Sequence, residues 1–203
     1  DFCLSRGLGD VYKRQVSDWP QEHQLGQVLL ALERARALFI HLYDQVPTGV
    51  VTVFVNQSLA ETRTACRTSH GVGCYSSRGD SHSIILSKDA LARGATRPAV
   101  HEYTHLAQHL MGYARAPAWV KEGIAEYYKS VEFKKGKLYV GYFDPARRMP
   151  GWLPVESVLT LHYGTMNSLG DPKIHQIFYL ESHLLVHMLR HTPGYSPVLP
   201  QLL

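Results

Sequence analysis

Apolar side chains recur with a helical period in the first clearly patterned stretch of the chain, residues 24–43. Their spacings of three and four residues place them on one face of a helix. The stripe consists of Leu25, Val28, Leu29, Leu32, Ala35, Leu38, Phe39 and Leu42. Pro47-Thr48-Gly49 then interrupts the pattern, because proline and glycine both disfavour a continuing helix. We therefore predict an amphipathic helix from Gln24 to Tyr43.

Short runs of β-branched and aromatic residues follow this helix and predict strands. Residues 50–56 (Val-Val-Thr-Val-Phe-Val-Asn) form one such run. Two further strands are expected around residues 71–75 and 82–86, because residues 77–80 (Ser-Arg-Gly-Asp) supply a turn between them. Residues 132–140 predict a second, separate hairpin.

Helical signals dominate the second half of the chain. The cap-type residue Thr96 and a proline in the first turn predict a helix over residues 96–111. Pro117 predicts the start of another helix, over residues 117–129. A short helix near 155–161 and a longer one over 172–191 complete the elements. Helices segregated from a small, mostly antiparallel sheet define the class as α+β.

The chain of 203 residues has the length of one ordinary domain. Residues 1–15 (DFCLSRGLGDVYKRQ) show no periodicity and resemble translated adapter sequence, so we set them aside as a non-native or disordered leader. The last residues, 196–203, stop without completing another element. We therefore expect one domain over residues 16–203, truncated at its C-terminus.

Composition narrows the class of protein further. An apolar fraction of 45% and a charged fraction of 19% are typical of a globular protein. No apolar run is long enough to span a membrane as a helix. A net charge of +4 gives no case for a nucleic-acid partner. The basic run Lys134-Lys135-Gly136-Lys137 is interpreted as a solvated hairpin tip, since no aromatic platform is evident beside it.

Two cysteines flank a glycine-rich turn and leave two interpretations open. Cys66 and Cys74 could form a disulfide if the protein is exported, and this possibility slightly favours a periplasmic or secreted protein over a cytoplasmic one. Together with His70 they also look like a partial metal site. That site lacks a fourth ligand nearby and the usual cysteine spacing.

The strongest chemical motif is H-E-x-x-H, which spans His101 to His105 inside a predicted helix. Residues four apart lie on one helix face, about 6 Å apart along the axis. Two neutral imidazoles in that arrangement can hold one Zn²⁺. Glu102 lies beside that face and can reach a metal-bound water as a general base. The alternative is two ordinary helix histidines with a solvated glutamate.

A third ligand has to come from elsewhere in the chain. The metzincin pattern would need glycine and histidine where this sequence has Gln108 and Met111, so that class is excluded. His109 lies about 12 Å along the axis from His101 and cannot share one ion with it. Two-histidine, one-glutamate zinc sites take the glutamate from a following helix, and Glu122 lies in the next predicted helix.

The segment Trp119 to Tyr127 reads W-x-x-E-G-x-A-E-Y. Together with the H-E-x-x-H motif it resembles the gluzincins, in particular the peptidase MA-like superfamily. The resemblance implies a zincin-like fold whose edge hairpin packs on the motif helix and whose helical subdomain follows. It also implies that Glu122 is the third zinc ligand and that Glu126 steadies the first histidine, as a carboxylate partner of a ligand histidine does.

The last predicted helix contains the candidates for stabilising an oxyanion. Its stripe of Ile174, Ile177, Phe178, Glu181, Leu184, Leu185 and Met188 predicts the face toward the core. Tyr179 and His183 project from another face, and gluzincins often use a downstream tyrosine or histidine on the oxyanion. The alternative is that both are surface residues packing on a loop. The ladder of His183, His187 and His191 could also bind a stray metal.

These patterns together predict a zinc-dependent peptidase of the gluzincin type with one Zn²⁺ per chain. Its partner would be a peptide or protein substrate, which Glu102 and the metal would help to hydrolyse. One rival interpretation is a catalytically silent zinc-binding module with the same fold. Another is a metal-free interaction domain. Substrate sequence and oligomeric state are left open by the sequence.

Overall fold

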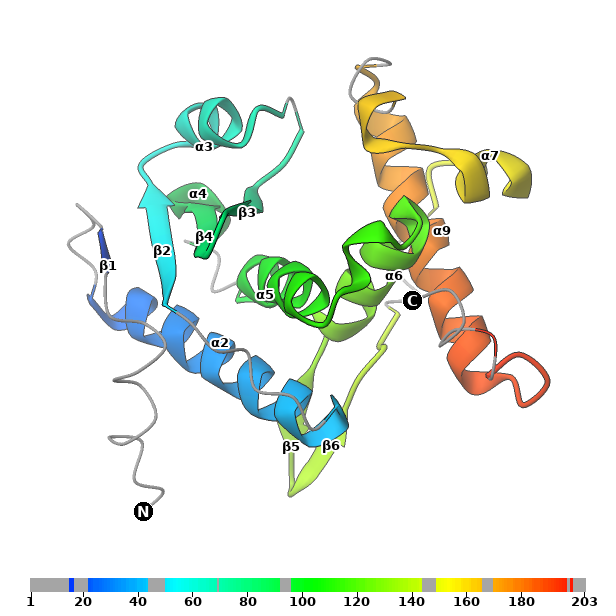
Figure 1. Ribbon diagram of the computed structural model, residues 1–203, viewed down its shortest axis with the longest axis horizontal. Coiled ribbons are helices and arrows are strands. Elements are labelled where there is room, and N and C mark those ends of the chain that lie inside the picture. Colours follow the sequence, from blue (N-terminus) through cyan, green and yellow to red (C-terminus); the bar gives the residue numbers. More distant parts are fainter. Residues whose placement is uncertain are drawn as a thin grey trace. The chain divides into compact units, whose positions relative to one another are not determined.

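The computed structural model describes residues 15–16, 22–43, 50–68, 70–91, 96–143, 149–165, 170–196 and 198. The chain divides into two compact units, residues 1–110 and 111–203 (Figure 1). Residues 1–14 of the expected leader lie outside the described part. The single domain expected over residues 16–203 and its truncation at the C-terminus stay predictions.

The first unit contains a sheet with the strand order β1-β2-β4-β3. Its strands are β1 (Gln15–Val16), β2 (Val51–Asn56), β3 (Gly73–Arg78) and β4 (Ser81–Ser87). Strand β3 pairs antiparallel with β4, as the predicted hairpin requires, but β4 pairs parallel with β2, with Val53 opposite Ile84. The expectation of a mostly antiparallel sheet is therefore wrong, because the sheet is mixed.

A helix that the pattern did not predict explains the mixed sheet. Helix α3 (Leu59–Cys66) follows β2, and the chain then enters β3 at the end of the sheet where β2 finishes (Figure 1). Strand β3 occupies the outer edge, and β4 returns between β3 and β2. The local signal for α3 is the S-x-x-E pattern of a capping box. The Ser58 hydroxyl accepts from the Glu61 amide, while the Glu61 carboxylate accepts from the amide of Gln57, the residue before the cap.

The predicted helical stripe forms much of the first unit's core. Helix α2 (Glu22–Tyr43) buries six of the eight stripe residues, whereas Leu29 is half-buried and Leu42 is 41% exposed. Helix α5 (Arg97–Leu110) packs on α2, where Phe39 meets Tyr103, and also on β3 and β4. These contacts bury one side of α5, so the side chains on its other side face away from this core. The short α4 (Lys88–Leu91) connects β4 to this helix.

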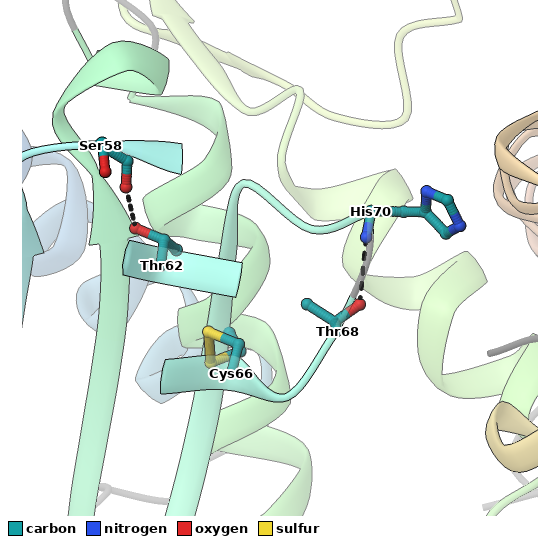
Figure 2. The surroundings of a disulfide bond; sticks show 6 residues. Ser58, Thr62, Cys66, Thr68 and His70 are labelled. Atoms are coloured by element: carbon teal, nitrogen blue, oxygen red, sulfur yellow. Dashed lines mark hydrogen bonds between the residues drawn. A yellow bond between two sulfur atoms is a disulfide. The ribbon is translucent and has the colours of Figure 1, made fainter. Parts of the chain in front are cut away.

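A disulfide joins the end of α3 to β3, because Cys66 and Cys74 are bonded with their Cα atoms 5.9 Å apart. Figure 2 shows the imidazole of His70 directed away from this disulfide. The partial metal site considered for these three residues is therefore wrong, since a disulfide leaves neither sulfur as a thiolate ligand.

The second unit is built mainly from helices. It comprises the short 3-10 helix η1 (Tyr113–Arg115), α6 (Ala118–Tyr128), α7 (Val155–Thr160) and α9 (Pro172–His191), with the hairpin β5 (Glu132–Lys134) and β6 (Lys137–Tyr139). Helices α6 and α9 pack together, and a Cβ at Gly123 would lie 2.3 Å from the Ser182 carbonyl oxygen. Glycine at this position therefore permits the close approach of the two helices.

Helix α9 is buried on more than the predicted stripe. Ile177, Phe178 and Glu181 are buried as expected, but Met188 is 42% exposed. The helix is contacted by both α6 and α7, so its buried surface extends to polar residues such as His183. No helix in the part of the chain that the structure describes is long and apolar enough to cross a membrane.

Candidate metal centre

His101 and His105 lie one turn apart on α5, and their imidazoles converge. Their Nε2 atoms are 3.1 Å apart, and the ring centroids are 4.8 Å apart in an edge-to-face arrangement. Both rings are half-buried. Tyr103 and Leu106, on the opposite side of α5, are fully buried in the core. The separation of the nitrogens suits two ligands of one ion at about 2.0–2.1 Å each.

Gln108 fixes the tautomer of His105. The side-chain oxygen of Gln108 lies 3.1 Å from Nδ1 of His105, and an amide oxygen can only accept a hydrogen bond. Nδ1 therefore carries the proton, and Nε2 presents its lone pair. The sequence analysis used Gln108 only to exclude the metzincin pattern. Its spacing of three residues from His105 on a helix was the signal that could have revealed this role.

Glu122 is held by a tyrosine that sequence reasoning missed. Glu122 lies on α6 and is 3% exposed. The hydroxyl of Tyr163 donates to its Oε1 at 2.7 Å, and the ammonium of Lys121 lies 5.2 Å from the centroid of the Tyr163 ring. The hydrogen bond orients the carboxylate. No local pattern predicts it, because the two residues are far apart in the sequence.

His101, His105 and Glu122 form a group that could hold a metal ion. Each offers one ligand atom, and the three atoms lie within 4.8 Å of one another. Two imidazole nitrogens and one carboxylate oxygen form a donor set that suits zinc and some other transition metals. The donor chemistry thus fits the expected ion, without identifying it.

Glu102 is buried beside the edge strand β3. Its side chain is 7% exposed, and a Cβ added at Gly73 would lie 3.5 Å from its Cγ. The same Cβ would lie only 2.8 Å from the Ile85 carbonyl oxygen. Gly73 therefore lets the start of β3 run close to both β4 and the motif helix.

Glu126 and His183 interact within the second unit. Glu126 lies one turn after Glu122, is 3% exposed and forms an ion pair with Lys129. Burial lowers the pKa of His183, and the nearby carboxylate of Glu126 partly opposes this shift. The predicted role of Glu126 in steadying His101 stays a prediction.

His183 is a core residue, so the alternative that places it on the surface is wrong. It is 4% exposed, and its ring lies 5.6 Å from that of Phe143 while hydrogen-bonding the backbone of Gly141. Tyr179 is half-buried and contacts the ring of Phe178 at 6.1 Å. The proposed roles of both residues at an oxyanion stay predictions.

The histidine ladder on α9 surrounds an aromatic ring. His183, His187 and His191 have ring centroids 6.2, 6.1 and 5.9 Å from that of Tyr127, whose hydroxyl lies 3.0 Å from Nε2 of His191. Among the described residues, the three side chains placed to hold a metal ion together are those of His101, His105 and Glu122. The three histidines of the ladder do not form such a group. The ladder therefore packs around Tyr127.

Comparisons of the chain with protein-family models, with curated proteins and with solved structures find no match.

Proposed function

We propose that this protein is a zinc-dependent peptidase of the gluzincin type that acts on peptide or protein substrates. The observation that carries the proposal is the group of His101, His105 and Glu122, whose ligand atoms lie within 4.8 Å of one another. The motif residue Glu102 is adjacent to the first of these ligands in the sequence. The mixed sheet, with its edge hairpin packed on α5, supports a zincin-like fold.

The chain's own residues prepare the ligands for Zn²⁺. Gln108 accepts from Nδ1 of His105 and so keeps Nε2 deprotonated for the ion. Tyr163 orients the Glu122 carboxylate through its hydroxyl. Partners of this kind raise the affinity of a site, because the ligand atoms need not reorganise when metal binds. When bound, zinc would lower the pKa of a water ligand and polarise the carbonyl of the scissile bond.

Proton transfer would fall to Glu102. Its carboxylate would take the proton of the attacking water and deliver it to the nitrogen of the leaving amine. Either the Tyr179 hydroxyl or the His183 imidazole would donate a hydrogen bond to the developing oxyanion. Burial keeps His183 neutral near pH 7, because it lowers the pKa of this imidazole.

Metal content and turnover test the proposal together. The wild-type chain should contain close to one zinc by elemental analysis, and His101→Ala should lose it. Glu102→Gln should retain the zinc but lose turnover of a peptide pool by orders of magnitude, because it removes the base without removing a ligand. Zinc bound by a wild-type chain that hydrolyses no peptide would favour the silent zinc-binding module. A chain that binds no zinc and is unaffected by chelator would favour the metal-free interaction domain.

We also propose that the protein is exported. The Cys66–Cys74 disulfide supports this, because disulfides persist mainly in oxidising compartments. Thiol counting on protein purified from its native source without reductant should find both cysteines oxidised. Free thiols at both positions would argue against export.

A further inference from the structure

The tip of the β5–β6 hairpin in the second unit concentrates positive charge. Lys134, Lys135 and Lys137 are all exposed, and the single acidic residue of the hairpin, Glu132, forms an ion pair with Lys134. Three lysines against one glutamate leave an excess of two positive charges over residues 132–139. Figure 1 shows the hairpin extending away from α6 to a turn that no other element of this unit covers.

The local structure does not favour lysine at two of these positions. Lys135 and Gly136 form the two-residue turn with φ angles of 51° and 71°, a conformation in which asparagine or aspartate is usually found before the glycine. Lys134 also pairs directly opposite Lys137, and like charges facing each other across two strands repel. Neither the turn nor the strand pairing therefore explains Lys135 and Lys137, which points to a partner outside the hairpin.

Exposed apolar surface accompanies the charge. Leu138 and Tyr139, both on β6, are 38% and 50% exposed. Tyr139 pairs opposite Glu132, the residue that forms the ion pair with Lys134. The sequence analysis noted no aromatic platform beside the basic run, and the structure places one exposed tyrosine, Tyr139, on the strand that follows it. Tyrosine rings with a polar end beside lysines are typical of surfaces that enter the headgroup layer of a membrane.

We propose that the tip of the β5–β6 hairpin binds the surface of membranes that contain anionic phospholipids. The lysine ammonium groups would contact lipid phosphates, while Leu138 and Tyr139 lie at headgroup depth. A protruding two-stranded tip fits a broad anionic surface. Single-stranded nucleic acid is instead bound in grooves lined by stacking aromatic residues. The proposal goes beyond the peptidase activity and does not depend on it.

Co-flotation with vesicles tests the proposal. The full chain is mixed at low ionic strength with vesicles of phosphatidylcholine alone, or with 40% phosphatidylglycerol, up to millimolar lipid. Binding should require the anionic lipid. It should weaken strongly at 0.5 M salt, because the Debye length is then only a few ångströms and charge attraction is screened. Equal binding to both vesicle types, or none to either, would overturn the proposal. Tighter binding of a single-stranded DNA oligonucleotide than of the anionic vesicles would overturn it in favour of a nucleic-acid partner.

Variants separate the membrane contact from stability. Lys135→Asn places a preferred residue in the turn, so it should unfold at the same temperature as the wild type or higher while binding anionic vesicles about five-fold more weakly. Adding Lys137→Gln should increase the loss to about 30-fold. Lys173→Gln, which neutralises an exposed lysine on α9, is the matched control and should bind like the wild type. Equal losses in the hairpin and control variants would show that net charge alone is responsible and would overturn the proposal.

Discussion

Replacing Gly123 by alanine would put a methyl group against the backbone of α9. The added Cβ would lie 2.3 Å from the Ser182 carbonyl oxygen and 2.6 Å from a methyl carbon of Val186. Real Cβ atoms are essentially never found within 3.0 Å of such atoms, so the two helices would have to separate by about 0.7 Å at this point. Gly26, in the second turn of α2, offers the matched control, because a Cβ there would have nothing within 4 Å.

The two substitutions should have opposite effects on the free energy of unfolding. Alanine is favoured over glycine in a helix by about 1 kcal/mol, and this gain applies at both positions. At Gly26 it should appear as a stabilisation of about 0.5–1 kcal/mol. At Gly123 the cost of overpacking is at the upper end of about 1–3 kcal/mol or beyond, because rigid backbone is displaced. We therefore expect Gly123→Ala to be destabilised by about 1–2 kcal/mol.

Urea denaturation followed by circular dichroism measures both effects. Fluorescence adds a local probe, since Trp119 lies on α6 and is 6% exposed. For a chain of this length, the loss at Gly123 corresponds to a melting temperature roughly 2–8 °C lower. A Gly123→Ala variant as stable as the wild type, or as stable as Gly26→Ala, would refute the close packing of α6 on α9 at this residue.

Two further predictions concern the metal centre and the buried histidines. Tyr163→Phe removes the hydrogen bond to Glu122 and should weaken zinc binding about 10–100-fold in a chelator competition assay, whereas Tyr195→Phe, at a residue that is 50% exposed, should have no effect. Burial lowers the pKa values of His82 and His183 in the folded chain, so the unfolded chain binds more protons just below pH 6.5. Their contribution to stability is therefore complete above about pH 6.5 and is lost as the pH falls through the lowered values. The urea midpoint of chelator-treated protein should be lower at pH 5.5 than at pH 7.5, less steeply so in His82→Gln, and an unchanged midpoint would contradict this.

Much of the secondary structure could be predicted because its signals are local. Spacings of three and four residues predicted α2, and a proline at the start of the helix with apolar spacing behind it predicted α5 and α9. The same locality brought His101 and His105 together, since any helix places residues four apart on one face. Helix α3 was missed, although its capping box at Ser58 and Glu61 is present in the sequence.

The sequence by itself therefore determined the longer helices, the hairpins and the pair of histidines, since each depends on residues within a few positions of one another. Tertiary structure alone decided the parallel pairing of β2 with β4 and the contact of Tyr163 with Glu122. It also decided that His183 is buried. These features depend on which distant segments bury each other's apolar surface, and that free energy is shared across the whole core. A single stretch of sequence therefore carries no local signal for them.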